Sequence, residues 1–224
     1  MAKPTISSYI RQNLDGIGKK KEPGPYITIS RQYGCDGYEL GDKLADRLNQ
    51  REGGRWRVFK KELLKQLAED TGLTEEVIEK ERLAKPSLLK DFLHGMRRSG
   101  IPDGYEIRNK ITVMVRTAAF EGYAIIIGQG GTAATADLDN GLSIRMEASR
   151  EWRIARVGWR EKLSRQATIA RIEKIEKQRK VLRKIYEQKN TKKPAFNLVI
   201  DNSTFNLDQI VEQIVFAMEQ KSLV

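Results

Sequence analysis

The sequence predicts an α/β fold in which five short strands of a parallel sheet alternate with helices. The strongest strand signal is the unbroken apolar run 124–127, which is typical of a strand buried on both faces. The stretch 26–48 adds a second signal, because a β-branched run, a loop with glycines at positions 34, 37 and 41, and an amphipathic helix follow one another. Loops at the carboxyl ends of parallel strands form the ligand crevice. The glycine-rich loops 30–37 and 128–133 are therefore expected to open onto one crevice.

Apolar periodicity and helix breakers predict the elements in chain order. Strands are expected at 26–30, 56–59, 124–127, 142–146 and 196–201. Helices are expected at 37–51, from 60 to Gly72, from Thr74, from Pro86 to Leu93, from Ile107 to Gly122, over 149–186 with a break near 162–168, and over 206–221. Residues 1–25 are expected to form an N-terminal arm, for which a mobile segment is favoured over a functional one. Residues 26–224 are expected to form one domain.

The composition excludes several kinds of site. One cysteine and one histidine in 224 residues leave no internal disulfide and no cysteine metal cluster, and they argue against a Ser-His-Asp triad. No apolar run approaches the roughly 18 residues that span a bilayer. The first residues lack the apolar core of a signal peptide. We therefore expect a cytoplasmic protein with no membrane partner and no metal site built from protein side chains alone.

The net charge of +11 is concentrated in one segment. Residues 150–193 hold 16 Lys and Arg against five Glu, which gives +11 in that segment alone. A concentrated basic segment indicates an anionic partner, a phosphate-rich ligand or a solvated helix, and these alternatives stay open. Nucleic-acid binding by this segment is one of them, although it carries no recognised reading motif.

Several motifs resemble one known family. They are Ile-Thr-Ile-Ser-Arg-Gln-Tyr-Gly at 27–34, Gly-Asp-Lys-Leu-Ala at 41–45, Val-Phe-Lys-Lys-Glu-Leu-Leu at 58–64, Gly-Tyr-Ala-Ile-Ile-Ile-Gly-Gln-Gly at 122–130 and Phe-Asn-Leu-Val-Ile-Asp-Asn-Ser at 196–203. In this order the chain resembles the cytidylate kinase-like branch of the P-loop nucleoside monophosphate kinases. The resemblance implies a three-layer P-loop nucleotide kinase fold with strand order 2-3-1-4-5. It also implies a substrate-binding insert at 60–104, a basic helical lid at 160–185, and transfer of the γ-phosphoryl group of ATP, with Mg²⁺, to a nucleoside monophosphate.

The resemblance also assigns the candidate site residues. ATP and its phosphates are expected over the loop after the first strand, at Gly34, Cys35, Asp36, Gly37, Tyr38 and Glu39. The acceptor nucleotide is expected at Gly128, Gln129 and Gly130. The catalytic candidates are Arg31, Arg156 and Arg179, and the further lid candidates are Arg160, Arg165 and Arg183. Only two or three lid arginines are expected to touch ligand. For Arg31 a surface ion pair is an equally good account.

The charged positions of this site depart from the family pattern. Gly37 stands where a P-loop has its lysine, and Glu39 stands where Ser or Thr holds the metal. Tyr38 and Gln129 replace two arginines of the branch, and Asp36 adds a negative charge, unless it or Glu39 serves as a Mg²⁺ ligand. Phosphoryl transfer depends on positive charge around the migrating group. Two hypotheses therefore remain: ATP-dependent transfer with a degenerate loop, or a catalytically inactive nucleotide-binding or regulatory module.

Overall fold

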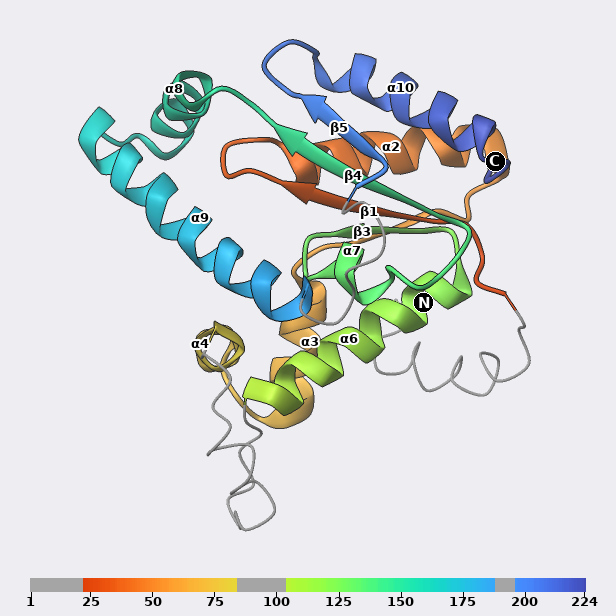
Figure 1. Cartoon of the computed structure of the whole chain (residues 1–224), viewed down its shortest axis with the longest axis horizontal. Helices are drawn as coiled ribbons and strands as arrows, with labels where there is room; N and C mark the ends of the chain where they lie inside the picture. The colour runs from red at the N-terminus through yellow and green to blue at the C-terminus, as the bar shows by residue number, and fades with distance from the viewer. Residues whose placement is uncertain (1–21, 84–103, 188–195) are drawn as a thin grey trace.

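A computed structural model describes residues 22–83, 104–187 and 196–224. The first 21 residues of the expected N-terminal arm and the helix expected from Pro86 lie outside the described residues. The described strands are β1 (Tyr26–Arg31), β2 (Arg57–Phe59), β3 (Ala124–Ile127), β4 (Gly141–Glu147) and β5 (Leu198–Asp201). They form one sheet in the order β2-β3-β1-β4-β5, with every neighbouring pair parallel (Figure 1). The predicted strand order is confirmed.

Alternate side chains of the central strands enter two different cores. Ile27 and Ile29 of β1, with Ile125 and Ile127 of β3, are packed in the core beneath α2 (Gly37–Glu52) and α10 (Leu207–Gln220). Ile126 of β3 points the other way, into the core beneath α3 (Glu62–Thr71) and α6 (Gly104–Glu121). The fold therefore has three layers, with the sheet between two layers of helices (Figure 1). This confirms the meaning of the apolar run in β3, which is buried on both faces.

Glycine at position 41 lets α2 lie close against the sheet. A Cβ atom there would stand 2.7 Å from Cδ1 of Ile127, which is too close for a real contact. Because α2 is held against β3 in this way, the loop that joins β1 to α2 (residues 32–36, here the β1–α2 loop) is fixed at the carboxyl end of β1. The expected strand, glycine loop and helix are all present.

The remaining helices are α4 (Glu75–Leu83), α7 (Gly131–Ala134), α8 (Arg150–Glu161) and α9 (Arg165–Glu187). The expected break in the basic helical segment is confirmed, because α8 ends at Glu161 and the next residue, Lys162, has a left-handed φ of 53°. One element was missed: residues 131–134, expected as loop, form the single helical turn α7. Four residues are too few for a helical pattern to be read from sequence.

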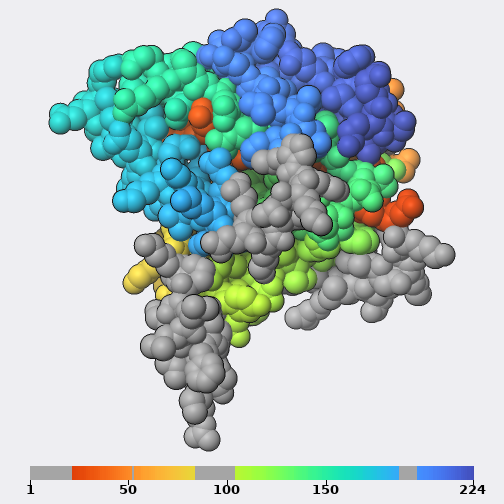
Figure 2. Space-filling view, viewed as in Figure 1, coloured from red at the N-terminus to blue at the C-terminus, as the bar shows by residue number. Residues whose placement is uncertain are grey.

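The helices α8 and α9, here called the lid helices, extend beyond the sheet and form one flank of the molecule (Figures 1 and 2). The far end of α9 returns to contact α4 and α7. No helix in the described ranges is long and apolar enough to cross a membrane.

Candidate functional site

A cleft of about 1570 Å³ opens where β1, the loop 128–130, α4 and α9 meet. Ser30 and Arg31 line it from the end of β1, and Gly128, Gln129 and Gly130 line it from the end of β3. The two glycine-rich loops therefore meet at one crevice, as the sequence predicted from the rule for parallel sheets.

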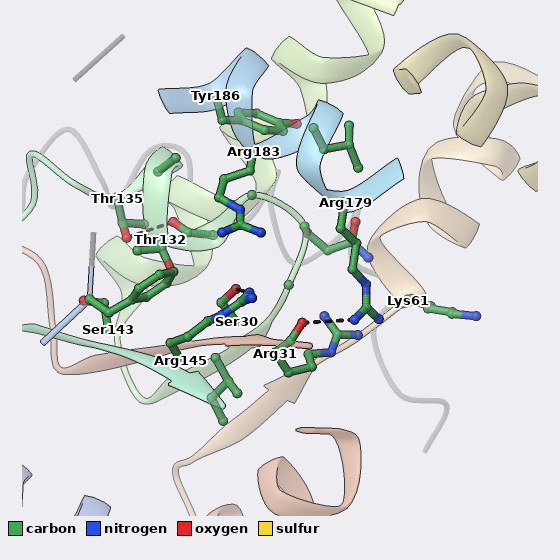
Figure 3. Close-up of a pocket in the computed structure, with 18 of the residues that line it drawn as sticks. Ser30, Arg31, Lys61, Thr132, Thr135, Ser143, Arg145, Arg179, Arg183 and Tyr186 are labelled. Carbon is green, nitrogen blue, oxygen red and sulfur yellow. Dashed lines mark hydrogen bonds between the residues drawn. The ribbon is translucent and has the colours of Figure 1, made fainter. Parts of the chain in front are cut away.

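Four arginines from three different elements point into this cleft (Figure 3). Arg31 comes from β1, Arg145 from β4, and Arg179 and Arg183 from one face of α9. Lys61 lies at the rim. A concentration of guanidinium groups around one cavity is the arrangement that proteins use for phosphate, because the planar fork of Arg matches two phosphate oxygens.

The four arginines differ in how many hydrogen bonds and ion pairs they make with other groups of the protein. The Arg145 side chain is only 6% exposed; its Nε lies 3.1 Å from Glu147, and its Nη1 donates to Ser30 Oγ at 2.9 Å. Arg179 donates to the carbonyl of Arg31 at 3.0 Å and lies 3.5 Å from the Glu176 carboxylate. Arg183 has no hydrogen bond or ion pair with any side chain in the described ranges.

The charges of this cluster act on one another. Burial lowers the pKa of Arg31 below its ordinary value. Burial, and after it the positive charge of Arg31, lowers the pKa of Arg179 to about 10. At about 10, the pKa of Arg179 keeps that guanidinium protonated at neutral pH. Positive groups held in a cleft against their own desolvation and repulsion indicate a site for an anion.

Arg31 occupies the space that the loop glycines leave. A Cβ atom on Gly128, whose φ is 71°, would stand 2.2 Å from Nη1 of Arg31, and one on Gly37 would stand 3.0 Å from its Cδ. The guanidinium also lies 4.7 Å from the centre of the Tyr38 ring. These two glycines therefore make room for the Arg31 side chain.

Gln129 is held by a buried arginine of α4. Its Oε1 accepts from Nη1 of Arg82, which also pairs with Glu79 at 2.7 Å. The Gln129 amide nitrogen is left to donate, so it can meet an acceptor atom of a base or sugar. Close by, the ring of Tyr186 stands 2.7 Å from where a Cβ atom on Gly130 would lie.

The β1–α2 loop does not present a free set of N–H groups. The amide of Cys35 donates to Gln32 O at 3.2 Å, that of Asp36 to Asn202 Oδ1 at 3.3 Å, and that of Gly37 to Cys35 O at 3.0 Å. Of the six predicted ATP-loop residues, Tyr38 lines the cleft, whereas Gly34, Cys35, Asp36, Gly37 and Glu39 do not. Burial raises the pKa of the Cys35 thiol to about 11, which argues against a reactive thiolate there.

The predicted lid arginines divide into two groups. Arg179 and Arg183 line the cleft. Arg156 and Arg160 instead form ion pairs with Asp36, and Arg165 pairs with Glu151 at 2.7 Å on the exposed surface. The negative charge that Asp36 adds to the loop is neutralised within the protein, because its carboxylate lies between these two guanidinium groups.

Sequence reasoning missed Arg145, Arg82 and Lys61. Arg145 had a usable signal: it is a charged residue inside an otherwise apolar strand, and such a residue is buried only with partners. Arg82 had none, because it stands in a helix rich in charged residues.

The described residues do not form a metal site by themselves. They contain no group of three or more Asp, Glu, His or Cys side chains placed to hold an ion. Asp36, a candidate Mg²⁺ ligand, is already neutralised by arginines. Magnesium is commonly held by one or two carboxylates together with substrate phosphates.

Comparisons with known proteins agree with this architecture. The sequence profile of the cytidylate kinase-like family matches residues 26–204. No curated protein sequence matches the chain significantly. An uncharacterized protein from Eubacterium ventriosum has a similar fold, with a TM-score of 0.62 and 18% identity over 87% of this chain and 98% of that chain. Shikimate kinase from Acinetobacter baumannii, in complex with shikimate, is more distant, with a TM-score of 0.46 and 15% identity over 90% of this chain and 96% of that one. Since the family profile covers most of its length, this chain belongs to the cytidylate kinase-like family.

Proposed function

We propose that this protein binds a nucleotide in the arginine-lined cleft, with the nucleotide phosphate held by Arg31, Arg145, Arg179 and Arg183. The observation that carries the proposal is the convergence of these four side chains from three elements on one cavity (Figure 3). Family membership supports a nucleotide kinase-like role. The acceptor type that this family implies is a nucleoside monophosphate.

The phosphate of such a ligand fits the charge of the cleft. A phosphate monoester carries a charge of about −1.5 to −2 at neutral pH and three strong acceptor oxygens. Arg183 has no hydrogen bond or ion pair in the described part of the chain, and Arg31 stacks on the Tyr38 ring. A bound phosphate would give both side chains a counter-charge. Gln129, held by Arg82, stands at the same cleft and can donate to the base or sugar.

A second candidate is phosphoryl transfer to that nucleotide from ATP. In this reaction a phosphate oxygen of the acceptor attacks the γ-phosphorus of ATP, the bond from that phosphorus to the β–γ bridging oxygen breaks, and ADP leaves. Arg31 favours this candidate, because it is the last residue before the β1–α2 loop and its side chain lines the cleft. The internal hydrogen bonds of the loop amides favour the alternative, a nucleotide-binding module without transfer.

Nucleic-acid binding through residues 150–193 is not part of the proposal. Much of the basic charge of the lid helices is engaged internally. Arg150 pairs with Glu173, Arg165 with Glu151, Arg171 with Glu161, and Arg156 and Arg160 with Asp36.

Calorimetric titration with CMP, UMP, AMP and GMP tests the binding proposal. Incubation with γ-labelled ATP, Mg²⁺ and the same panel tests transfer. Arg31→Ala is expected to weaken monophosphate binding about tenfold or more, because it removes a charged hydrogen-bond donor. The matched control is Arg55→Ala, which removes the same charge where Arg55 stacks on Tyr123, before β2. If no monophosphate binds, or if the two variants bind alike, the proposal is wrong.

A further inference from the structure

We propose that the lid helices keep the β1–α2 loop in a self-occupied state, in which the carboxylate of Glu176 takes the position of a phosphate group. Release of Glu176 is then required before a triphosphate can bind the loop. The inference rests on the proposed function, because it concerns the donor side of the same nucleotide site.

The first observation is the hydrogen bond from the backbone N–H of Tyr33 to Oε1 of Glu176. Tyr33 belongs to the glycine loop that leads into the N-terminus of α2. Backbone N–H groups at such a position are ordinarily the donors to a bound anion. In this protein the anion is a side chain of α9, and a phosphate oxygen and the Glu176 carboxylate cannot share the same donor.

The second observation is that an acidic residue of the loop forms ion pairs with the lid helices. Asp36 in the loop pairs with Arg156 and Arg160 of α8, and its side chain is only 10% exposed. These two arginines are therefore held by an internal carboxylate. The carboxylate of Glu176 in α9 therefore occupies a donor of the loop, and the carboxylate of Asp36 in the loop occupies the arginines of α8.

The third observation is the placement of the Tyr33 side chain between the two lid helices. Its hydroxyl donates to Glu161, and its ring lies 5.4 Å from the Arg179 guanidinium and 5.9 Å from that of Arg160. The ring also packs against the small apolar cluster of Ile154, Val157 and Ile172. The loop cannot change conformation without withdrawing Tyr33 from this cluster, so loop and lid move together.

These contacts give an expected effect on affinity. When only a fraction of molecules is competent to bind, the apparent dissociation constant is the intrinsic one divided by that fraction. Removing one charge-assisted hydrogen bond is expected to raise the competent fraction about tenfold. Glu176→Ala should therefore bind ATP about tenfold more tightly than the unmodified protein.

The matched control is Glu173→Ala. Glu173 stands on the same helix and carries the same charge, but it pairs with exposed Arg150 and does not touch the loop. Glu176→Asp separates contact from charge, because it keeps the negative charge while its shorter side chain withdraws from the Tyr33 amide. Asp36→Asn frees Arg156 and Arg160 without altering α9 and should also raise ATP affinity.

Two measurements test the inference: calorimetry with ATP and with CMP for each variant, and hydrogen exchange at the Tyr33 amide. The expected result is tighter ATP binding and faster Tyr33 exchange in Glu176→Ala and Glu176→Asp, with Glu173→Ala unchanged. If CMP binds but ATP affinity is the same in Glu176→Ala and Glu173→Ala, the self-occupied state is refuted and the proposed function stands. If Glu176→Asp behaves like the unmodified protein while Glu176→Ala does not, charge alone acts and the contact is refuted. If neither CMP nor ATP binds any variant, the proposed function fails and this inference fails with it.

Discussion

Replacing Arg183 with alanine separates ligand binding from folding more cleanly than any other change in the cleft. Arg183 has no hydrogen bond or ion pair within the described ranges and is half-buried on α9. Its removal should therefore change the free energy of unfolding by no more than about 0.5 kcal/mol, the usual range for substitutions that break no contact. Alanine is also a good helix former, so α9 should be preserved.

The expected cost to binding is larger. A hydrogen bond to a charged group contributes about 1.5–3 kcal/mol. Partial exposure places Arg183 at the lower end, and about 1.4 kcal/mol corresponds to a tenfold weaker dissociation constant. The residue that follows it, Lys184, is exposed and carries the same charge, so Lys184→Ala measures the effect of net charge alone. That control should change affinity less than about twofold, since exposed charges are screened within about 10 Å at 0.1 M salt.

Calorimetry with the best-binding monophosphate at fixed ionic strength gives the dissociation constants, and thermal unfolding of the free proteins gives the stabilities. Equal dissociation constants for Arg183→Ala and Lys184→Ala would show that Arg183 does not contact the phosphate. A large loss of stability in Arg183→Ala would show that the side chain has a structural role that the described contacts do not contain.

Three further predictions concern stability. Gly130→Ala should lower the free energy of unfolding more than Gly53→Ala in chemical denaturation; both have φ near 74°, but only the first would place a Cβ against an aromatic ring of α9. The hydrogen bond from Tyr33 holds the pKa of Glu161 below its ordinary 4.5. Above pH 4.5 this hydrogen bond contributes fully to stability, and the contribution is lost as the pH falls through the lower folded pKa of Glu161. Glu161→Gln should therefore flatten the acid limb of a stability profile below pH 4.5. Asn206→Ala should cost about 1 kcal/mol in thermal unfolding, because it removes the capping box of α10.

The fold was predictable because its strands are simple in sequence. The apolar run Ala124–Ile127 predicts a strand that is covered on both faces. The glycine loop after Ile29, followed by an amphipathic pattern, predicts the helix that comes next. The helical turn at 131–134 was not predictable, since it depends on the left-handed backbone of Gly130, whose φ is 73°. The N-terminal arm and much of the 60–104 insert remain predictions, as does the division into domains.

The location of the site was predictable from the sequence, but the ion pairs and hydrogen bonds that its residues make were not. Arg31, Gln129, Arg179 and Arg183 were named from sequence and do line the cleft. The pairing of Asp36 with lid arginines more than a hundred residues away was not predictable, because ion pairs between distant segments leave no periodic signal. For the same reason the residues of the β1–α2 loop were assigned to ATP, whereas several of its amides are bonded to other parts of the chain.

The mutual repulsion of the cleft arginines has a consequence for how the protein responds to salt. Arg179 is buried and lies in the positive potential of Arg31, so folding the empty protein works against its charge. Added electrolyte weakens that repulsion and also weakens the attraction for a phosphate. Ionic strength should therefore act in opposite directions on the two equilibria, stabilising the empty fold while loosening the complex. A chain built in this way is most dependent on its ligand for stability in dilute buffer.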